Sequence, residues 1–595
     1  MREFSTPLTI EVPATGNLTD DVVTNAREAH DEIGFSRSTE HGWVDVTYGQ
    51  FQAEVSAAAK GLMAAGVEAG DRVALICKTR YEWTLLDYAI WFAGAVTVPI
   101  YETSSAEQIE WILRNSGAKA VVAEGPEHLS RINEVREGLT HLHHVWSIAD
   151  NAVEVLSRLG EDVGDDELEK RRTQATPLDV ATLVYTSGTT GSPKGCMLTH
   201  GNFMFELGVA VDELERLFDT EGASTLLFLP LAHVFARIIQ VGCIKARARL
   251  GHSSDIKNLL PDLQEFKPTF ILAVPRVFEK VFNTASQKAT ADGRGRIFDR
   301  AAEIAIAYSR GIESGRPSLA VRAQHSVFKR LVYGKLLDAL GGQCEFAVSG
   351  GAPLGERLGH FYRGIGVTIL EGYGLTETTA ALSVNLPDAI KIGSVGRPLP
   401  GTAVRVSDDG ELLFRGGQVF CGYWEDEEAT AAALESDGWF HSGDIGEVDD
   451  EGFVRITGRK KEILVTAGGK NVAPAVLEDR LRAHALVDQC MVVGDGRPFI
   501  AALVTLDAEV LPVWAEANGK SGALDRLVDD PDLLAEIEAA VEDANKAVSK
   551  AESIRKFRIV EAAWTEEGGQ LTPSLKLKRN VVMREFKDEV AALYL

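Results

Sequence analysis

The feature that most constrains the fold of this chain is the alternation of helical and strand patterns in its first two-thirds. Apolar residues recur at helical spacing over residues 51–62, and the strand pattern RVALIC follows at 72–77. The cycle repeats, ending in AVTVPIY at 95–101 and in AVVAE at 120–124. These strand patterns are short and rich in Val and Ile, as parallel strands covered on both faces are. The alternation therefore predicts βαβ units built around largely parallel sheets.

The rest of the chain has other secondary-structure patterns. A helical pattern predominates from residue 296 to residue 340, where Phe328, Leu331, Val332 and Leu336 predict one apolar stripe. After residue 396, short strands separated by glycine turns predict a β-rich subdomain. The C-terminal segment mixes strand and helix patterns and resembles a separate small α/β unit.

Composition argues against several classes of function. The 61 Lys and Arg against 87 Asp and Glu give a net charge of −26, which disfavours nucleic acid as a partner because phosphates require a basic surface. The six cysteines are scattered without a C-x-x-C pair, which disfavours a zinc site or a disulfide framework and favours a reducing compartment. No signal-peptide pattern opens the sequence, and the longest apolar stretch, residues 88–100, is shorter than the ~20 residues that span a bilayer. We expect a soluble cytoplasmic protein with at most peripheral contact at the inner membrane face.

The stretch YTSGTTGSPKG at residues 185–195 carries the clearest functional signal. It follows the apolar strand ATLV and combines three glycines, five Ser or Thr hydroxyls and one lysine. Free backbone N–H groups and hydroxyls of this kind form a concave donor surface suited to a polyphosphate. Pro193 and Gly195 stand where a Walker A loop requires Gly and then Ser or Thr, so the stretch predicts a phosphate loop of another class.

This loop resembles the phosphate loop of the adenylate-forming superfamily, which comprises acyl-CoA synthetases, adenylation domains and luciferases. Further motifs resemble those of the superfamily in the same order: SGGAPL at 349–354, EGYGLTE at 371–377, GELLFRGGQVFCGYW at 410–424, DGWFHSGD at 437–444, GRKK at 458–461, AGGKNVAP at 467–474 and SLK at 574–576. The resemblance covers nearly the whole chain. The chain resembles the long-chain fatty acyl-CoA synthetases most, in its length, the RKK junction, the run LKLKR and the helical insertion before SGGAPL.

The resemblance implies an activity and an architecture. A fatty acid and ATP would give acyl-AMP and pyrophosphate, and CoA would then give the thioester, so the implied substrates are a long-chain fatty acid, ATP and CoA, with Mg²⁺ as cofactor. Residues 1–459 would form an N-terminal AMP-binding domain of the α/β class that carries the ATP and acyl sites. Residues 460–595 would form a small mobile C-terminal α/β domain that acts as a lid and rotates about a hinge near Lys461. Whether the chain forms a homodimer is left open.

The resemblance also assigns roles to single residues. Thr186 and Glu377 would hold Mg²⁺, Asp444 would accept hydrogen bonds from the ribose hydroxyls with help from Arg459, and Lys576 would bridge the carboxylate and the α-phosphate. Tyr373 would stack on adenine. The implied ATP-binding set is Thr186, Ser187, Gly188, Thr189, Thr190, Gly191, Lys194, Gly350, Gly351, Ala352, Glu371, Gly372, Tyr373, Gly374, Thr376, Asp444 and Arg459. The implied CoA-side loop is Gly468, Gly469 and Lys470.

His233, in the motif PLAHVFAR, completes the implied catalytic set with Lys576, Glu377 and Thr186. In relatives this motif lines the acyl pocket and moves when the thiol tunnel opens. The alternative is an ordinary core histidine. Arg237 stands near the position where some long-chain members have a gating tryptophan, which puts that gate in doubt here.

Other assignments have structural alternatives as well. Tyr373 in a Gly-Tyr-Gly turn is also typical of a core aromatic residue, and Asp444 of a turn or helix cap. Lys576 lies in the basic run KLKR, where a solvated surface is the usual interpretation. Lys578 competes for its role, because Leu575 replaces the glycine that commonly precedes the catalytic lysine.

Three other functions are weighed against the CoA ligase. An acyl-AMP ligase would hand its acyl group to a carrier protein. A non-catalytic lipid-binding or scaffold protein should have lost at least one of Thr186, Glu377, Asp444 and Lys576, and all four are present. A luciferase-like oxygenase is disfavoured because the chain ends in ALYL, which is not the peroxisomal address S-K-L.

Two segments have interpretations that the sequence does not separate. Residues 278–340 supply enough Phe, Ile and Leu either to wall an acyl tunnel or to form a plain helix core. Residues 315–335 hold five basic residues and no acidic residue, which fits a solvated helix face or a patch for anionic lipid headgroups or CoA phosphates. The five bases are Arg316, Arg322, Lys329, Arg330 and Lys335.

Overall fold

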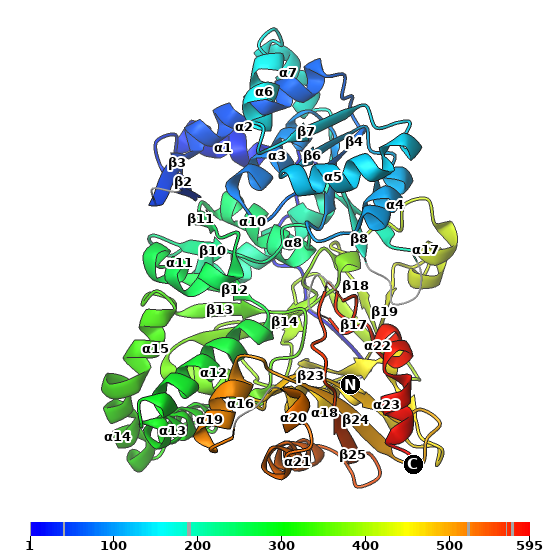
Figure 1. Cartoon of the computed structure of the whole chain (residues 1–595). Helices are drawn as coiled ribbons and strands as arrows, with labels where there is room; N and C mark the ends of the chain where they lie inside the picture. Colours follow the sequence, from blue (N-terminus) through cyan, green and yellow to red (C-terminus); the bar gives the residue numbers. More distant parts are fainter. Residues whose placement is uncertain (1, 40–41, 187–191, 521–523, 567, 573–575) are drawn as a thin grey trace.

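The computed structural model describes residues 2–39, 42–186, 192–520, 524–566, 568–572 and 576–595. The protein is a mixed α/β structure with several sheets (Figure 1). The N-terminal sheet and its helices lie at the top of Figure 1, and a second α/β layer lies below them. A β-rich sheet and the C-terminal unit, in yellow to red, complete the lower part.

The predicted βαβ alternation is confirmed in a six-stranded sheet. Its order is β7-β6-β4-β5-β8-β9, with the bounds His144–Ser147, Ala120–Ala123, Arg72–Ile76, Val96–Ile100, Val180–Thr186 and Lys194–Thr199. All neighbours are parallel except β8 and β9, which are antiparallel. The intervening helices are α2 (Tyr48–Ala64), α3 (Tyr81–Phe92), α4 (Ala106–Ser116) and α5 (Pro126–Val135). The predicted phosphate loop connects β8 to β9.

Two further sheets continue the α/β region. The first has the order β12-β13-β14-β15-β16, with the bounds Phe270–Ala273, Phe346–Ser349, Thr368–Tyr373, Ser383–Val384 and Arg397–Pro398; β12 to β14 are parallel. The second has the order β10-β11-β2-β3, with the bounds Ser224–Leu227, Arg249–His252, Ile33–Thr39 and Gly42–Thr47. Their helices include α10 (Val234–Ala246), α12 (Pro275–Ala291) and α16 (Glu356–Ile365). The motifs SGGAPL and EGYGLTE begin at the ends of β13 and β14.

The helical segment before β13 corrects one prediction. It forms α13 (Gly295–Glu313), α14 (Leu319–Phe328), a π-helical turn η3 (Lys329–Tyr333) and α15 (Gly334–Ala339). The π turn fits one additional residue into its ring, so the helical register shifts. Tyr333 and Leu336 are buried, whereas Leu331, which was expected in the apolar stripe, is 60 % exposed. The predicted stripe was therefore wrong at Leu331.

The residues expected to wall a tunnel lie mainly in a packed core between α12, α13 and α16. The ring of Phe282 contacts those of Phe298 and Phe361 at centroid distances of 5.4 and 4.8 Å, and Phe278 contacts Tyr362 at 5.3 Å. These contacts favour the helix-core interpretation for these positions. An acyl tunnel through this segment stays a prediction.

The predicted β-rich subdomain is a five-stranded antiparallel sheet. Its order is β1-β17-β18-β19-β20, with the bounds Glu3–Ser5, Ala403–Val406, Glu411–Arg415, Phe440–Val448 and Val454–Arg459. No local pattern predicts that β1 belongs here, because its partner β17 is some 400 residues away, as in the pair Glu3 and Arg405. This sheet places Asp444 on β19 and Arg459 at the end of β20.

The C-terminal unit has its own sheet and cores. Its strands are β23 (Val487–Val493), β24 (Ile500–Leu506) and β25 (Ile554–Ile559), covered by helices that include α18 (Pro474–Arg482), α21 (Pro531–Asn545) and α22 (Arg579–Glu585). Two hydrophobic clusters draw only on residues 464–594, whereas the others lie before residue 457. Across the part of the chain that the structure describes, no helix combines the length and the apolar character that crossing a membrane requires.

Candidate active site

Asp444 is the centre of a polar cluster formed by three of the predicted residues. The hydroxyl of Tyr373 donates to Oδ2 of Asp444 (2.5 Å), and Nε of Arg459 lies 3.2 Å from Oδ1. Asp444 and Arg459 are opposite each other in the register of β19 and β20, so the sheet itself sets this ion pair. Burial raises the pKa of Asp444, and the Arg459 guanidinium opposes that rise. The carboxylate is thus held between strands, and it is neither a turn residue nor a helix cap.

Glu377 lies in the short turn η4 (Thr376–Thr378), which directly follows the EGYG segment. Its Oε1 atom accepts a hydrogen bond from the hydroxyl of Tyr423 (2.8 Å). The next two residues, Thr379 and Ala380, have φ values of 56° and 113°, a region that L-amino acids rarely adopt. Such conformations cost free energy and persist where the surroundings fix them, often at functional sites. The turn that presents Glu377 is therefore rigidly specified.

The glycines of this motif have a structural role besides the predicted ATP contact. A Cβ atom on Gly374 would lie 1.3 Å from the carbonyl oxygen of Ala380. A Cβ atom on Gly372 would lie 3.2 Å from the carbonyl oxygen of Ser383. A side chain at Gly374 would therefore push apart the backbone segments that hold Glu377 in place.

Thr186 and Glu377 come together at the buried thiol of Cys196. Burial raises the pKa of Cys196 well above its usual value, and the Glu377 charge acts in the same direction, while a hydrogen bond with Thr186 opposes it. Thr186 ends β8 and faces Lys194 at the start of β9. The two ends of the predicted phosphate loop thus lie beside Glu377. The loop residues Ser187, Gly188, Thr189, Thr190 and Gly191 lie outside the described residues.

Tyr423 is a site residue that the sequence analysis did not single out. Its hydroxyl contacts Glu377, and the Lys194 ammonium lies 5.2 Å from the centre of its ring, within the range of a cation–π contact. Lys194 also lies 3.6 Å from a carboxylate oxygen of Asp426. The signal was available, since Tyr423 lies inside the motif that ends in CGYW.

The predicted Mg²⁺ site offers only a few protein ligands. Among the described residues, no three His, Cys, Asp or Glu side chains converge as a ready-made metal site. Mg²⁺ in nucleotide sites is commonly held by one or two carboxylates together with substrate phosphates and water. One carboxylate, from Glu377, beside the hydroxyl of Thr186 is compatible with that pattern.

Glu371 has a backbone partner. Its Oε1 atom accepts a hydrogen bond from the backbone N–H of Leu354 (2.9 Å), so the side chain holds the end of the SGGAPL turn in place. Burial raises its pKa to about 8. In the turn itself, Gly351 has a φ of 82°, and a Cβ atom on Gly350 would lie 3.1 Å from the ring of Phe235. Direct contacts of these residues and Ala352 with ATP stay predictions.

Lys576 reaches the same cluster from the C-terminal unit. Its side chain keeps an exposed surface, yet the protein around it removes enough water to lower its pKa. The positive charge of Arg459 acts in the same direction, and the carboxylates of Asp444 and Glu377 oppose it. Two backbone contacts with Thr572 hold its turn: Lys576 N–H donates to Oγ1 (3.0 Å), and Thr572 N–H donates to the Lys576 carbonyl (2.8 Å). Lys578 instead precedes α22 as its N-terminal flanking residue.

His233 and Arg237 lie one helical turn apart but in different surroundings. His233 is half-buried at the start of α10, where its Nδ1 atom accepts the backbone N–H of Phe235 (3.2 Å). Burial, followed by the charge of Lys576, lowers its pKa to about 3, so the ring is neutral near the site. Arg237 is fully buried and pairs with the equally buried Asp87 of α3. It points into the core of the N-terminal region.

The predicted hinge and CoA-side loop lie at the border of the C-terminal unit. Lys461 lies in the turn η5 (Lys460–Glu462) that follows β20. Gly468, Gly469 and Lys470 lie in the exposed connection between β21 (Leu464–Val465) and β22 (Asn471–Val472). Lys470 pairs with Glu552 of the same unit (3.3 Å).

Ion pairs also join helix α12 to the C-terminal unit. Nη2 of Arg276 lies 2.6 Å from Oδ1 of Asp488 and 3.5 Å from Oδ2 of Asp507. Lys280, one turn further along α12, lies 3.5 Å from Glu509. These contacts accompany the arrangement in which Lys576 reaches Asp444.

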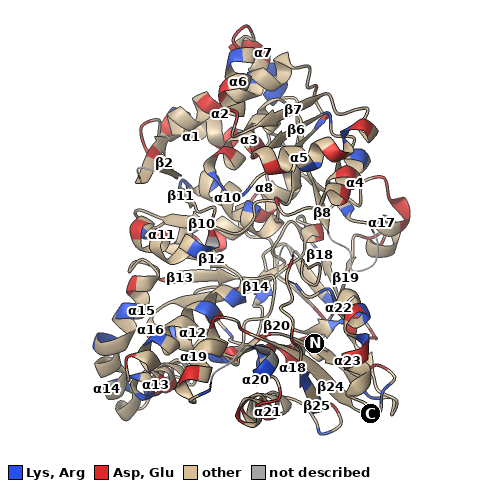
Figure 2. Ribbon diagram, in the orientation of Figure 1, with Lys and Arg blue, Asp and Glu red and all other residues tan. Residues whose placement is uncertain are grey.

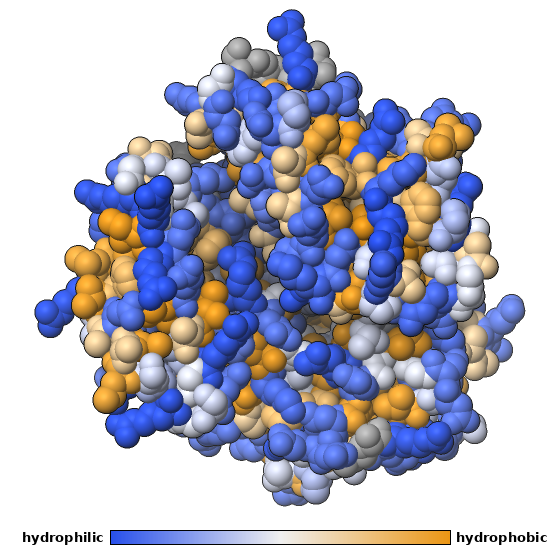
Figure 3. Space-filling model, turned by 90° about the horizontal axis from the view of Figure 1, so that it is seen from below, coloured by the Kyte–Doolittle hydropathy of each residue, from blue (hydrophilic) through white to orange (hydrophobic). Residues whose placement is uncertain are grey.

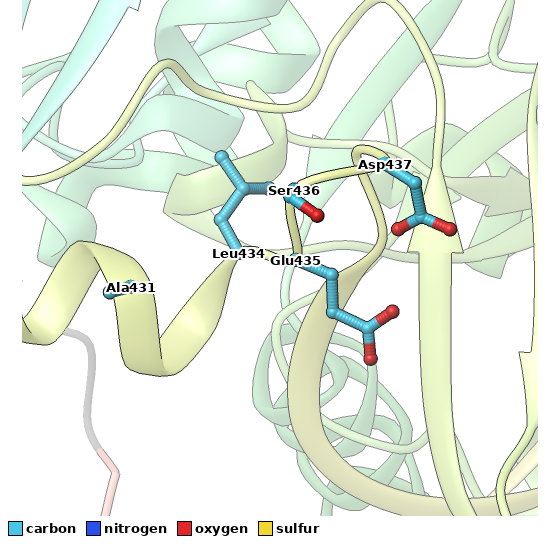
Figure 4. Close-up of a pocket in the computed structure, with 5 residues that line it drawn as sticks. All are labelled: Ala431, Leu434, Glu435, Ser436 and Asp437. Carbon is cyan, nitrogen blue, oxygen red and sulfur yellow. The ribbon is translucent and has the colours of Figure 1, made fainter.

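A surface pocket next to β19 does not involve any of these residues. It is lined by Ala431, Leu434, Glu435, Ser436 and Asp437, at the end of α17 (Glu427–Ala433) and in the turn that follows (Figure 4). The carboxylate of Glu435 already contacts Nε2 of His441 (2.9 Å). The pocket adds nothing to the site.

Comparisons with known proteins were made for the whole chain. The family model "AMP-binding enzyme" matches residues 23–424, and the model "AMP-binding enzyme C-terminal domain" matches residues 461–595. The long-chain-fatty-acid–CoA ligase FadD15 of Mycobacterium tuberculosis is 51% identical over 599 residues, which cover 100% of both chains. The long-chain-fatty-acid–CoA ligase ACSBG2 of Xenopus laevis is 30% identical over 596 residues, covering 93% of this chain and 80% of that protein.

Solved structures show the same fold at lower identity. The anthranilate CoA ligase AuaEII in complex with anthranoyl-AMP has a TM-score of 0.72 at 21% identity, covering 97% of this chain and 99% of its own. The O-succinylbenzoate coenzyme A synthetase of Bacillus subtilis in complex with ATP and magnesium ion has a TM-score of 0.66 at 20% identity, covering 94% and 98%.

Proposed function

Because the chain belongs to the AMP-binding enzyme family, we propose that it is a long-chain fatty acid–CoA ligase. It activates the fatty acid with ATP to acyl-AMP and pyrophosphate, and it then transfers the acyl group to CoA with release of AMP. The observation that carries this assignment is the full-length identity of 51% to ligases of that name. The meeting of Lys576, Asp444 and Glu377 supports it, because the three charges come from separate parts of the chain.

The first half-reaction brings two anions together. A carboxylate oxygen attacks the α-phosphorus, and the bond from that phosphorus to the bridging oxygen of pyrophosphate breaks. Catalysis therefore depends on positioning and on positive charge near the reacting oxygens. We assign that charge to Lys576. Thr186 and Glu377 would hold Mg²⁺, which supplies further positive charge to the phosphates when it is bound.

The polar cluster around Asp444 fits the nucleotide. Asp444 would accept the two ribose hydroxyls, and Tyr373 and Arg459 would hold its carboxylate in orientation before ATP arrives. Arg459 also favours the ionised form of Asp444, because its guanidinium opposes the rise in pKa that burial causes. A charged acceptor makes stronger hydrogen bonds to hydroxyls than a neutral carboxyl group does.

The second half-reaction requires another arrangement of the C-terminal unit. The CoA sulfur attacks the acyl carbon, and the bond from that carbon to the phosphate oxygen of AMP breaks. Residues 460–595 would turn about Lys461, removing Lys576 from the site and bringing Gly468, Gly469 and Lys470 toward it. The neutral ring of His233, whose pKa the charge of Lys576 helps to lower, would line the path by which CoA enters.

The sharpest test measures both products across a panel of acids. We expect pyrophosphate release to increase from acetate to long-chain acids, and we expect a thioester with CoA but not with an acyl carrier protein. Glu377→Gln should slow pyrophosphate release by about 10²–10³, the usual cost of one preorganised electrostatic contact. Thioester formation only on the carrier protein would establish the acyl-AMP ligase instead. An absence of pyrophosphate release with every acid would establish the non-catalytic alternative.

We place the reaction in the cytoplasm. ATP and CoA are supplied there, and the six cysteines are free thiols, as a reducing compartment requires. A membrane contact is argued below from a separate surface.

A further inference from the structure

Helix α14 packs against the rest of the protein with one face and leaves its other face exposed to solvent. None of its 10 residues, all of which the structure describes, is buried. Leu319, Val327 and Leu331, which follows in the π turn, are 81, 55 and 60 % exposed. Within α14, Leu319, the exposed Ala323 and Val327 recur every fourth residue, a spacing that puts side chains on one helical face, and the exposed Leu331 follows them in the π turn. We call Leu319, Ala323, Val327 and Leu331 the apolar stripe of α14.

The inner face of α14 is anchored, so the stripe cannot turn inward. The ring of His325 stacks on Tyr308 of α13 at a centroid distance of 3.8 Å. Its Nε2 atom donates to the carbonyl oxygen of Gly364 (2.7 Å). On the neighbouring side, Nη2 of Arg300 donates to the Gln324 amide oxygen (2.9 Å). The exposure of the stripe is thus a consequence of fixed contacts.

Basic side chains surround the stripe. Residues 314–337 contain no Asp or Glu, although the chain as a whole has 26 more acidic than basic residues. The five bases are exposed, and no ion pair joins them to another described residue: Arg316, Arg322, Lys329, Arg330 and Lys335. Figure 2 shows this concentration of blue on α14 and α15. Seen from below, blue and orange side chains are mixed at the left edge of Figure 3, the side on which α14 lies in Figure 1.

We propose that α14 and η3 form a docking surface for the anionic face of a lipid bilayer. The apolar stripe enters the boundary between headgroups and acyl chains, as the apolar face of an interfacial helix does. The five bases meet the anionic headgroups, and such attractions decay within a Debye length of roughly 8–10 Å. The acidic remainder of the molecule is repelled, so only this corner faces the membrane.

The charge pattern favours a bilayer over a second copy of the chain. A copy would present a surface with an acidic excess to the bases, but it would have to match four spaced apolar residues with a groove. A fluid headgroup layer accommodates both without such a match. Free CoA, whose phosphates share the anionic chemistry, would engage the bases and leave the stripe in water.

The test uses the full chain with two kinds of vesicle, phosphatidylcholine alone and an equal mixture with phosphatidylglycerol. Sedimentation should show binding to the mixed vesicles at low salt, weak binding to phosphatidylcholine and a loss of binding at high salt. The variant Arg322→Ser, Lys329→Ser, Arg330→Ser should bind the mixed vesicles at least tenfold more weakly. The variant Leu319→Ser, Val327→Ser, Leu331→Ser should lose binding to the same extent, because insertion and attraction are both required.

A matched control removes three exposed bases elsewhere, as Arg526→Ser, Lys550→Ser, Arg558→Ser. It makes the same change in net charge and should bind vesicles as the wild type does. All variants should activate a short, water-soluble fatty acid at the wild-type rate, which separates this proposal from the catalytic one. The proposal is overturned if the wild type ignores mixed vesicles, if either α14 variant binds like the wild type, or if the control loses as much. It is also overturned if the basic variant changes only the KM for CoA, or if the apolar variant only abolishes self-association.

Discussion

At the residue scale, the carboxyl groups of the site differ mainly in what surrounds them. Asp444 has the Arg459 guanidinium beside one carboxylate oxygen and accepts the Tyr373 hydroxyl on the other, which suits an acceptor of hydroxyl groups. Glu371 is buried with one backbone N–H, and burial raises its pKa to about 8. Glu377 accepts a tyrosine hydroxyl on one oxygen, and no described residue makes a hydrogen bond to the other. Three acids in neighbouring motifs thus have three tasks.

The pKa of Glu371 leads to a prediction about stability. Its folded pKa of about 8 lies above its ordinary value of 4.5, so the folded state holds a proton that the unfolded state releases in this interval. The free energy of unfolding should therefore fall as pH rises through this window, by up to about 1.4 kcal/mol per pH unit. Glu371→Gln should flatten the dependence in urea unfolding. The exposed Glu538→Gln serves as the control, and an equal slope in all three proteins would contradict the prediction.

Lys576 should separate the two half-reactions. It lies among Asp444, Glu377 and Arg459. In the proposed mechanism its ammonium bridges the carboxylate and the α-phosphate while the phosphorus–oxygen bond forms. Lys576→Ala should slow acyl-AMP formation by at least ~10², the order expected for one charge-stabilising donor. With supplied acyl-AMP and CoA it should form thioester within a few-fold of the wild type. Lys578→Ala is the matched control and should change neither rate; the reverse result would mean that the motif register is two residues out.

At the element scale, the buried pair of Asp87 and Arg237 connects α3 with α10. Nε of Arg237 donates to Asp87 (2.9 Å), and its guanidinium carbon lies 5.0 Å from the ring centre of Trp91. Thr97 and Gln240 also donate to the same carboxylate. An arginine so enclosed has a structural task, which supports the doubt about a gate at this position.

Removing this arginine should affect stability and leave specificity unchanged. Arg237→Met leaves Asp87 buried without its counter-charge, a change that typically costs about 3–5 kcal/mol of unfolding free energy. Adding Asp87→Asn should recover part of that loss in thermal and urea unfolding. The preference among fatty acid chain lengths should stay as in the wild type. A changed chain-length profile with unchanged stability would mean that Arg237 gates the acyl path.

The sequence predicted elements well where local pattern decides them. The strands at 72–77, 95–101 and 120–124 carry their own signal, because alternation and β-branched residues are local properties. The burial of Leu331 was mispredicted because a π turn changes the helical register without a local cue. Tyr423 was missed as a partner of Glu377 because that contact joins residues 46 positions apart. Motifs identify such loops, but only the fold shows which side chains meet.

At the scale of the whole molecule, ion pairs from α12 help to hold the C-terminal unit in its present orientation. Arg276 bonds to Asp488 and Asp507, and Lys280 pairs with Glu509. The first set is largely shielded from solvent, whereas the second is exposed on both sides. Contacts of this strength would suit the proposed rotation of this unit between the two half-reactions.

Weakening these contacts should affect one half-reaction only. Arg276→Ala should slow acyl-AMP formation roughly fivefold, which corresponds to about 1 kcal/mol for a partly exposed ion pair. Thioester formation from supplied acyl-AMP and CoA should be unchanged or faster, since the proposed rotation of the C-terminal unit would break the pair. Lys280→Ala, which removes the more exposed pair, should have a smaller effect. An equal loss in both assays would indicate general damage to α12.

Strand β1 stays without its partner strand during most of the synthesis of the chain. Its partner, around Arg405, is translated some 400 residues later. At ~5–20 residues per second, the ribosome leaves this strand unpaired for roughly 20–80 s, and the last strand of the six-stranded sheet, β9, is translated about halfway through that time. During that interval the chain carries an open strand that a neighbouring nascent chain on the same message could capture. A cell that makes this protein at high density on its polysomes therefore has reason to keep a chaperone near its first residues.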